Sequence, residues 1–180
     1  MGRLLVVLLA FSMLVVGKVS FAEDELEPGL VCEIFNIGEE VSDFVDLKDK
    51  KAAKKLVVKT IDVDAGDGEW PDSGGLSEQF VVRWTGVIKI EKDGKYKFYT
   101  ESDDGSKVTI DKKQVVDNGG LHAAEEKDGE VELKAGNHEI QVDFFENGGQ
   151  ASCKMSWEPA GGAKEIVPAK VLFHKKGTEK

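Results

Sequence analysis

Basic residues are scarce in this 180-residue chain, in which 24 Lys and Arg stand against 34 Asp and Glu and give a formal net charge of -10 at pH 7. Proteins that bind nucleic acid neutralise phosphates with a basic surface, so this balance argues against DNA or RNA as a partner. Proline is also rare, with 4 residues, whereas 20 glycines are enough for many tight turns. The composition favours a single all-β domain.

Long apolar runs are absent except at the N-terminus. Arg3 precedes an apolar run at residues 4–16, and the small residues Ser20 and Ala22 follow it in the arrangement that signal peptidase recognises. A membrane span needs about 20 apolar residues, so this run is too short for an anchor. We therefore predict a secretory signal peptide at residues 1–22, no transmembrane segment after its cleavage, and a secreted protein, extracellular or periplasmic.

Only two cysteines are present, Cys32 and Cys153, and both follow the predicted cleavage site. The oxidising compartment that an exported protein enters allows the thiols to pair, and a disulfide closing so long a loop would stabilise the fold by about 4 to 5 kcal/mol. We predict this disulfide. The open alternative is two separate buried thiols that pack as small hydrophobic side chains. A metal site is disfavoured, because no second Cys or His lies close to either residue in the sequence.

The remaining sequence alternates short β-branched and aromatic runs with turns. The strongest run is 80–90, where Phe80, Val82 and Trp84 share one face, and a turn at 92–94 leads into a second strand at 96–100. Further strands are expected at 29–37, 56–63, 107–110, 114–117, 130–133, 138–145 and 151–157. Residues 48–56 fit either a helix or a solvated loop. So many short strands predict an antiparallel β-sandwich at 29–173, between an acidic leader at 23–28 and a flexible tail at 174–180.

The amino-acid sequences of several segments resemble those of one protein family. Seven segments occur in the order seen in PA14 domains: FVVRWTG (80–86), DGKYKF (93–98), SDDGS (102–106), TID (109–111), VVDNGG (115–120), LKAGNH (133–138) and MSW (155–157). The resemblance covers residues 29–172. It implies the PA14-like β-sandwich that occurs in yeast adhesins, glycosidases and bacterial toxins, most often in a carbohydrate-binding role.

The resemblance also implies a calcium site. In the adhesin branch, two consecutive aspartates joined by a cis peptide and an asparagine from a neighbouring loop hold Ca²⁺, and sugar hydroxyls complete its coordination. The matching residues here are Asp103, Asp104 and Asn147. Carboxylate and amide oxygens suit this hard cation, and Gly105 allows a sharp bend directly after the pair. The alternative is that both segments are turns, since Asp-Gly and Asn-Gly are favoured there without any metal.

A second acidic segment contains Asp62, Asp64, Asp67, Glu69 and Asp72. It begins like an EF-hand loop, but Gly66 takes the place of the third ligand and Ser73 that of the bidentate Glu, so the EF-hand interpretation fails. In the same segment, Trp70 fits either an exposed platform for a sugar ring or a residue tucked over the sandwich. Trp84 and Trp157 lie in alternating strands and are expected in the core.

Catalytic motifs are lacking. The three histidines, His122, His138 and His174, are scattered, and no Gly-flanked Ser motif accompanies them. We therefore predict no enzyme but an exported glycan-recognition module that depends on calcium, with a glycan or cell-surface polysaccharide as partner. The alternative is a structural or protein-interaction domain of the cell envelope, without sugar binding, in which the paired aspartates serve only the turn.

Overall fold

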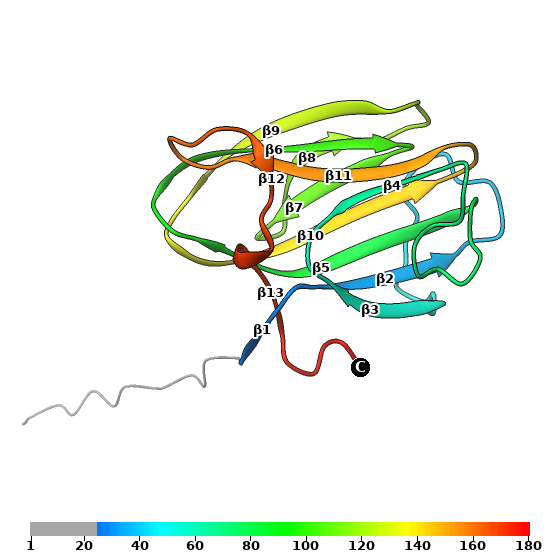
Figure 1. Cartoon of the computed structure of the whole chain (residues 1–180), viewed down its shortest axis with the longest axis horizontal. Coiled ribbons are helices and arrows are strands. Elements are labelled where there is room, and N and C mark those ends of the chain that lie inside the picture. The colour runs from blue at the N-terminus through cyan, green and yellow to red at the C-terminus, as the bar shows by residue number, and fades with distance from the viewer. Residues whose placement is uncertain (1–24) are drawn as a thin grey trace, which may run out of the picture.

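The computed structural model describes residues 25–180, so the predicted signal peptide lies outside the described residues. Two antiparallel sheets pack face to face, as Figure 1 shows with β6 and β11 above β5 and β2. In the larger sheet the order is β1 (Leu26–Pro28), β13 (Leu172–Lys175), β5 (Phe80–Ile90), β10 (Gly136–Glu146), β7 (Ser106–Ile110) and β8 (Lys113–Asn118), while β2 (Leu30–Asn36) pairs with β5 and with β3 (Lys54–Val58).

In the smaller sheet the order is β12 (Glu165–Ile166), β11 (Ala151–Glu158), β6 (Gly94–Asp103) and β9 (Glu125–Leu133), with β4 (Asp62–Gly66) paired to β11. Over residues 25–180 the only helix is one 3₁₀ turn, η1 (Ala169–Val171), and no helix there is long and apolar enough to cross a membrane. The predicted all-β antiparallel sandwich is therefore confirmed.

The interior of the sandwich is built from alternate residues of facing strands. The inward residues of β11 are Ala151, Cys153, Met155 and Trp157, and all of them are buried. Trp70 joins this core as well, with 3% of its surface exposed and its ring stacked on Phe144 at 4.8 Å between centroids. Trp70 is therefore a core residue and not an exposed platform for a sugar ring.

The two cysteines, predicted to form a disulfide, are both free thiols in the structure. Cys32 lies in β2 of the larger sheet and Cys153 in β11 of the smaller one, and both are buried in the core. Facing sheets pack about 10 Å apart, whereas a disulfide needs Cα atoms within about 7 Å, so strand placement does not favour pairing. Burial raises the pKa of both thiols, that of Cys32 to about 12. The structure thus agrees with the alternative, in which the two cysteines are separate buried thiols.

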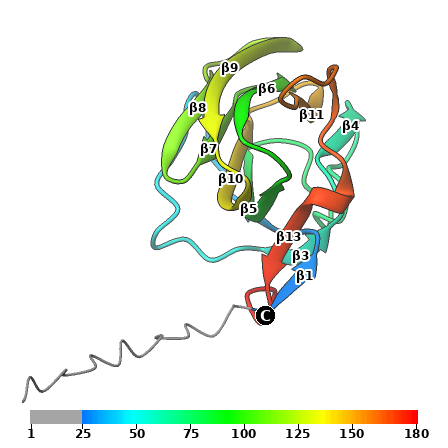
Figure 2. The same ribbon diagram turned by 90° about the vertical axis from the view of Figure 1, so that its left-hand side faces the viewer.

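The predicted domain limits leave out one strand at the start of the described chain and half of another at its end. Part of the expected acidic leader forms β1, and the expected tail begins inside β13, where His174 is buried. These two strands pair with each other (Figures 1 and 2). Glu27 lies opposite His174 in this pairing. The leader and the start of the tail are therefore part of the sandwich.

Residues 37–53, between β2 and β3, form a long loop rather than the helix considered for 48–56. Figure 2 shows this cyan segment running along the outside of the molecule. Val41 and Leu47 from the loop pack on Phe35, Val81 and Phe145 from the larger sheet and form a second apolar cluster. This loop, called loop 37–53 below, is therefore held against the outer face of the larger sheet.

Candidate metal centre

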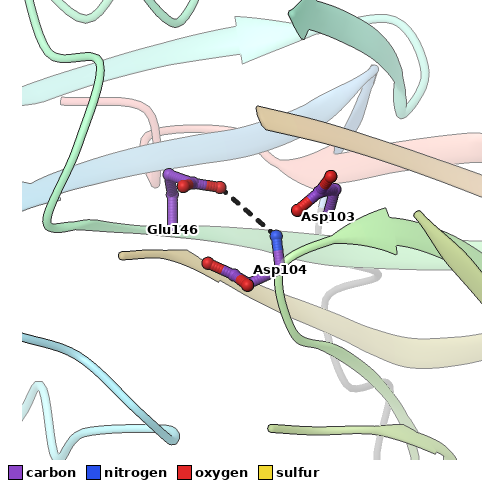
Figure 3. A group of neighbouring side chains, drawn as sticks. All are labelled: Asp103, Asp104 and Glu146. Atoms are coloured by element: carbon purple, nitrogen blue, oxygen red, sulfur yellow. Dashed lines mark hydrogen bonds between the residues drawn. The ribbon is translucent and has the colours of Figure 1, made fainter. Parts of the chain in front are cut away.

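The candidate site lies at one end of the sandwich, where β6 leads into β7 and where β10 ends. Asp103 is the last residue of β6 in the smaller sheet, Asp104 follows it, and Glu146 is the last residue of β10 in the larger sheet. One oxygen from each of these carboxylates lies within 4.8 Å of the others. Figure 3 shows the three side chains turned toward one another from the two sheets.

The peptide bond between Asp103 and Asp104 is cis, as the family resemblance implies. Gly105 follows it at a point of close approach, because a Cβ there would lie 2.4 Å from the ring of Phe145 and 3.0 Å from the carbonyl oxygen of Gly120. The backbone N–H of Phe145 also donates to the Gly105 carbonyl over 2.9 Å. Glycine at this position therefore lets the turn pack directly against β10.

Backbone N–H groups orient the buried Asp104 carboxylate. His122 donates to Oδ1 over 3.1 Å and Asn147 donates to Oδ2 over 3.0 Å. The N–H of Asp104 itself donates to Glu146 Oε2 over 3.2 Å, drawn as the dashed line in Figure 3. Asp104 is thus fixed by the loop after β8 and the loop after β10, and it fixes Glu146 in turn.

Burial and mutual repulsion oppose ionisation of Glu146 and Asp103. Burial, followed by the Asp104 and Asp103 charges, raises the pKa of Glu146 to about 8, although N–H groups of Asp104 and Gly148 partly offset this. Burial and the Asp104 charge likewise raise the pKa of Asp103. A cation placed among the three carboxylates would remove this repulsion.

The donor set fits calcium. Glu146 is fully buried, and its Oε1 atom has no hydrogen-bond partner. An unpaired buried carboxylate oxygen is costly, and a hard cation that takes 6 to 8 oxygen ligands satisfies it. Asp103, Asp104 and Glu146 would hold the ion, with room left in its coordination shell for water or hydroxyl oxygens.

Asn147, predicted as the third ligand, lies beside the carboxylates. Its backbone N–H bonds to Asp104, while its side-chain Oδ1 accepts a hydrogen bond of 2.9 Å from the backbone N–H of Val41 in loop 37–53. Coordination by this side chain stays a prediction.

Glu146 is the site residue that sequence reasoning missed. The inward face of β10 carries Ile140, Val142 and Phe144, and the same alternation places Glu146 on that face. A carboxylate that continues the core-facing positions of a strand is the signal that could have revealed it, because a buried charge needs a partner.

The other sequence candidates lie apart from this group. Within residues 25–180, Asp103, Asp104 and Glu146 form the one cluster of His, Cys, Asp and Glu able to hold a metal, so the acidic segment around Asp62 and Asp72 forms none. His138 bonds to Asp111, and His174 is buried with its Nδ1 3.1 Å from the Gly29 carbonyl oxygen.

The sequence profile of the PA14 domain family matches residues 38–170. Over 118 residues, or 65% of this chain, the sequence is 31% identical to Anti-sigma-I factor RsgI3 of Acetivibrio thermocellus, and the match spans 18% of that protein. This chain thus corresponds to a small part of that relative.

Solved structures agree on the fold. An anti-sigma factor domain-containing protein from Clostridium clariflavum superposes with a TM-score of 0.71 at 26% identity, over 86% of this chain and 49% of that chain. A structure described as the PA14 sugar-binding domain from RTX adhesin superposes with a TM-score of 0.67 at 22% identity, over 82% of this chain and 98% of that one. The first similarity again covers only about half of the relative.

Proposed function

This chain belongs to the PA14 domain family, and from that premise we propose that it is an exported, non-catalytic glycan-recognition module in which Asp103, Asp104 and Glu146 hold a calcium ion. The observation that carries the proposal is the buried, unpartnered Oε1 of Glu146 beside two more carboxylates. When bound, calcium supplies coordination positions that sugar hydroxyls can take in place of water.

The residues of the chain have separate tasks in this proposal. Asp104 is oriented by two backbone N–H groups, so its oxygens are placed before any ion arrives. Glu146 closes the inner side of the site and is inaccessible to a glycan, while half-buried Asp103 lies on the solvent side. Ligand hydroxyls would therefore approach past Asp103 and the loops that follow β8 and β10.

The glycan part of the proposal draws support from the solved relative whose description names sugar binding. It is tested by applying the labelled protein to a glycan array in calcium and again in excess chelator. We expect binding in calcium that chelation and Asp104→Asn both abolish. The matched control is Asp67→Asn, which removes an exposed carboxylate from the acidic segment and should bind like the wild type. Calcium binding without any bound glycan would contradict the glycan part.

A second candidate function is favoured by the similarity to anti-sigma factors. In this candidate the domain is a protein-interaction module and the carboxylates hold a structural ion. The glycan array and thermal unfolding together separate the two functions. A structural ion should raise the melting temperature in calcium, while the array shows no bound glycan.

Export is a separate element of the proposal, and it depends on the predicted cleavage after Ala22. Expression of the full chain in a secreting host, followed by N-terminal sequencing of the culture or periplasmic fraction, should give a protein beginning at Glu23. Retention of Met1 on all of the protein would contradict export.

A further inference from the structure

The charge of this acidic chain is reversed over one stretch of its surface, residues 48–59. The sequence there is KDKKAAKKLVVK, which has six lysines and one aspartate, whereas the whole chain has a formal net charge of -10. The stretch covers the end of loop 37–53, the strand β3 and the residue that follows β3. It is therefore a strongly basic patch on a protein that is acidic elsewhere.

Most lysines of this stretch have no carboxylate partner. On the smaller sheet, by contrast, Lys95, Lys97 and Lys154 each lie within 3.2 Å of a carboxylate oxygen on a neighbouring strand. In residues 48–59, Lys55 lies 3.5 Å from Glu33. Five exposed lysines remain that form no ion pair with any carboxylate of residues 25–180: Lys48, Lys50, Lys51, Lys54 and Lys59. These five residues, called the lysine strip below, carry charges that the fold does not neutralise.

The loop part of the strip is held by anchored backbone. Leu47 is buried, Ala52 is half-buried, and both pack in the second apolar cluster. The N–H of Lys50 donates to the Leu47 carbonyl over 3.1 Å, and the N–H of Ala53 donates to the Ile34 carbonyl over 2.8 Å. The lysines between these anchors are therefore presented to solvent from a fixed turn, which lowers the entropy lost when a ligand binds.

The strand β3 continues the strip along the rim of the larger sheet. In the part of the chain that the structure describes, β3 pairs with β2 alone, and Figure 1 shows it on the far side of β2 from β5. Lys54 begins β3 and Lys59 follows its last residue, so their Cα atoms lie up to about 17 Å apart. Lysine often guards an exposed strand edge against aggregation. That role accounts for the two lysines beside β3 but not for the three in the loop.

Acidic residues beside the strip limit what it can bind. Asp49 lies within it, and the first half of loop 37–53 carries four more acidic residues, Glu39, Glu40, Asp43 and Asp46. Charges farther away than the Debye length, about 8 Å at physiological ionic strength, are largely screened. A narrow anionic chain can therefore follow the lysines, whereas a broad polyanion such as duplex nucleic acid would also cover the acidic flank.

We propose that the lysine strip binds a carboxylate-bearing polysaccharide, a polyuronate, without calcium. Each sugar unit of such a chain bears one carboxylate, so successive charges can meet successive ammonium groups. Lysine suits this contact because its ammonium is a point charge, without the planar fork with which arginine recognises phosphate. Val57, which is 40% exposed between Lys54 and Lys59, offers an apolar contact to the C–H face of a sugar ring. This surface goes beyond the proposed calcium site and does not depend on it.

The test is fluorescence anisotropy with a labelled alginate oligosaccharide as the probe, in excess chelator. The wild type should bind it, and raising the salt from about 0.05 to about 0.5 M should weaken binding by about tenfold. Removing the three loop charges together should also weaken binding by about tenfold, in the variant Lys48→Gln, Lys50→Gln, Lys51→Gln. The matched control changes the net charge equally at three exposed lysines elsewhere and should bind within about twofold of the wild type: Lys89→Gln, Lys113→Gln, Lys170→Gln.

Three results would overturn the proposal. Equal weakening in the control and in the strip variant would show that net charge, and not the strip, sets the affinity. A wild type that binds no alginate in chelator would refute the strip and leave the calcium site standing, because chelator removes calcium from that site. Binding to phosphatidylglycerol vesicles but not to alginate would assign the strip to a membrane surface.

A second variant keeps the proposal testable if the triple variant does not fold. Lys54→Gln combined with Lys59→Gln removes the two charges beside β3 and leaves the loop unchanged. This double variant should bind alginate about threefold more weakly than the wild type. Thermal unfolding checks that it is folded, and unchanged alginate binding in the folded variant would count against the proposal.

Discussion

The backbone N–H of Asp104 donates a hydrogen bond to Glu146 Oε2 over 3.2 Å and so joins two residues that lie 42 positions apart. Asp104 follows the last residue of β6 in one sheet, and Glu146 ends β10 in the other. The bond therefore ties the two layers together at the end of the sandwich. It also places a buried carboxylate beside a second one, an arrangement that a bound cation would stabilise.

Glu146 should make the calcium-free protein less stable as pH rises. Its pKa is about 8 in the folded state, above the ordinary value of 4.5, so its contribution is fully present below about pH 4.5 and is lost as pH rises toward 8. In chelator, the melting temperature of the wild type should fall between pH 5 and pH 8. Glu146→Gln removes the titrating group, so in chelator at pH 8 this variant should melt at a higher temperature than the wild type.

Thermal unfolding in chelator across this pH range is the measurement for Glu146. Glu132→Gln, at an exposed position in β9, is the control, and its melting temperature should fall with pH as steeply as that of the wild type. An equal slope in Glu146→Gln and the wild type would show that Glu146 does not carry the effect.

His138 should stabilise the fold at acid pH. Burial opposes its charge, but hydrogen bonds to Asp111 Oδ2 at 2.6 Å and to the Lys134 carbonyl at 2.8 Å outweigh burial and raise its pKa. The contribution is fully present below the ordinary value near 6.5 and is lost as pH rises through the folded-state pKa. His138→Gln should therefore lower the melting temperature more at pH 5.5 than at pH 8.5.

The partner substitution checks this pair. Asp111→Asn removes the carboxylate that His138 contacts. In the Asp111→Asn background, the melting temperatures lost on His138→Gln at pH 5.5 and at pH 8.5 should therefore differ less. Melting curves at the two pH values decide the outcome, and a His138→Gln deficit that grows at pH 8.5 would contradict the ion pair.

Gly129 should be intolerant of any side chain. It lies in β9 opposite Phe98, and a Cβ there would lie 1.7 Å from the carbonyl oxygen of Val115 in β8. Backbone atoms at this distance must shift, so Gly129→Ala should lower the free energy of unfolding by about 1 to 3 kcal/mol or more. Urea unfolding measures the change. Gly148→Ala, whose Cβ would meet its nearest atom at 3.7 Å, is the control with little expected effect.

Strands with regular alternation could be predicted from the sequence, and strands defined by distant partners could not. β5 and β11 carry apolar residues at every second position, and their predicted limits lie within a residue of the observed ones. The single strand expected at 56–63 was wrong: β3 ends at Val58, and β4 begins at Asp62 and pairs with β11 in the other sheet, a distant partner that the local pattern does not reveal. The pairing of β1 with β13 likewise joins the two ends of the described chain and leaves no local signal.

The same distinction applies to the candidate site. Asp103 and Asp104 are adjacent in sequence and belong to a recognisable segment, so they could be named before the fold was known. Glu146 joins the candidate site only because the two sheets pack on each other, which the sequence near Glu146 does not reveal. The hydrogen bond from Val41 to Asn147 spans 106 residues, and no pattern near Asn147 predicts it.

The central claim is that Asp103, Asp104 and Glu146 form a calcium site. Calorimetric titration of calcium into the purified, chelator-treated protein tests it most directly, with Asp104→Ala, Glu146→Gln and the control Asp67→Ala measured alongside. We predict saturable binding at one site, abolished in Asp104→Ala, weakened about tenfold or more in Glu146→Gln, and unchanged in Asp67→Ala. Absence of saturable binding in the wild type, or binding that Asp104→Ala leaves intact, would contradict the claim.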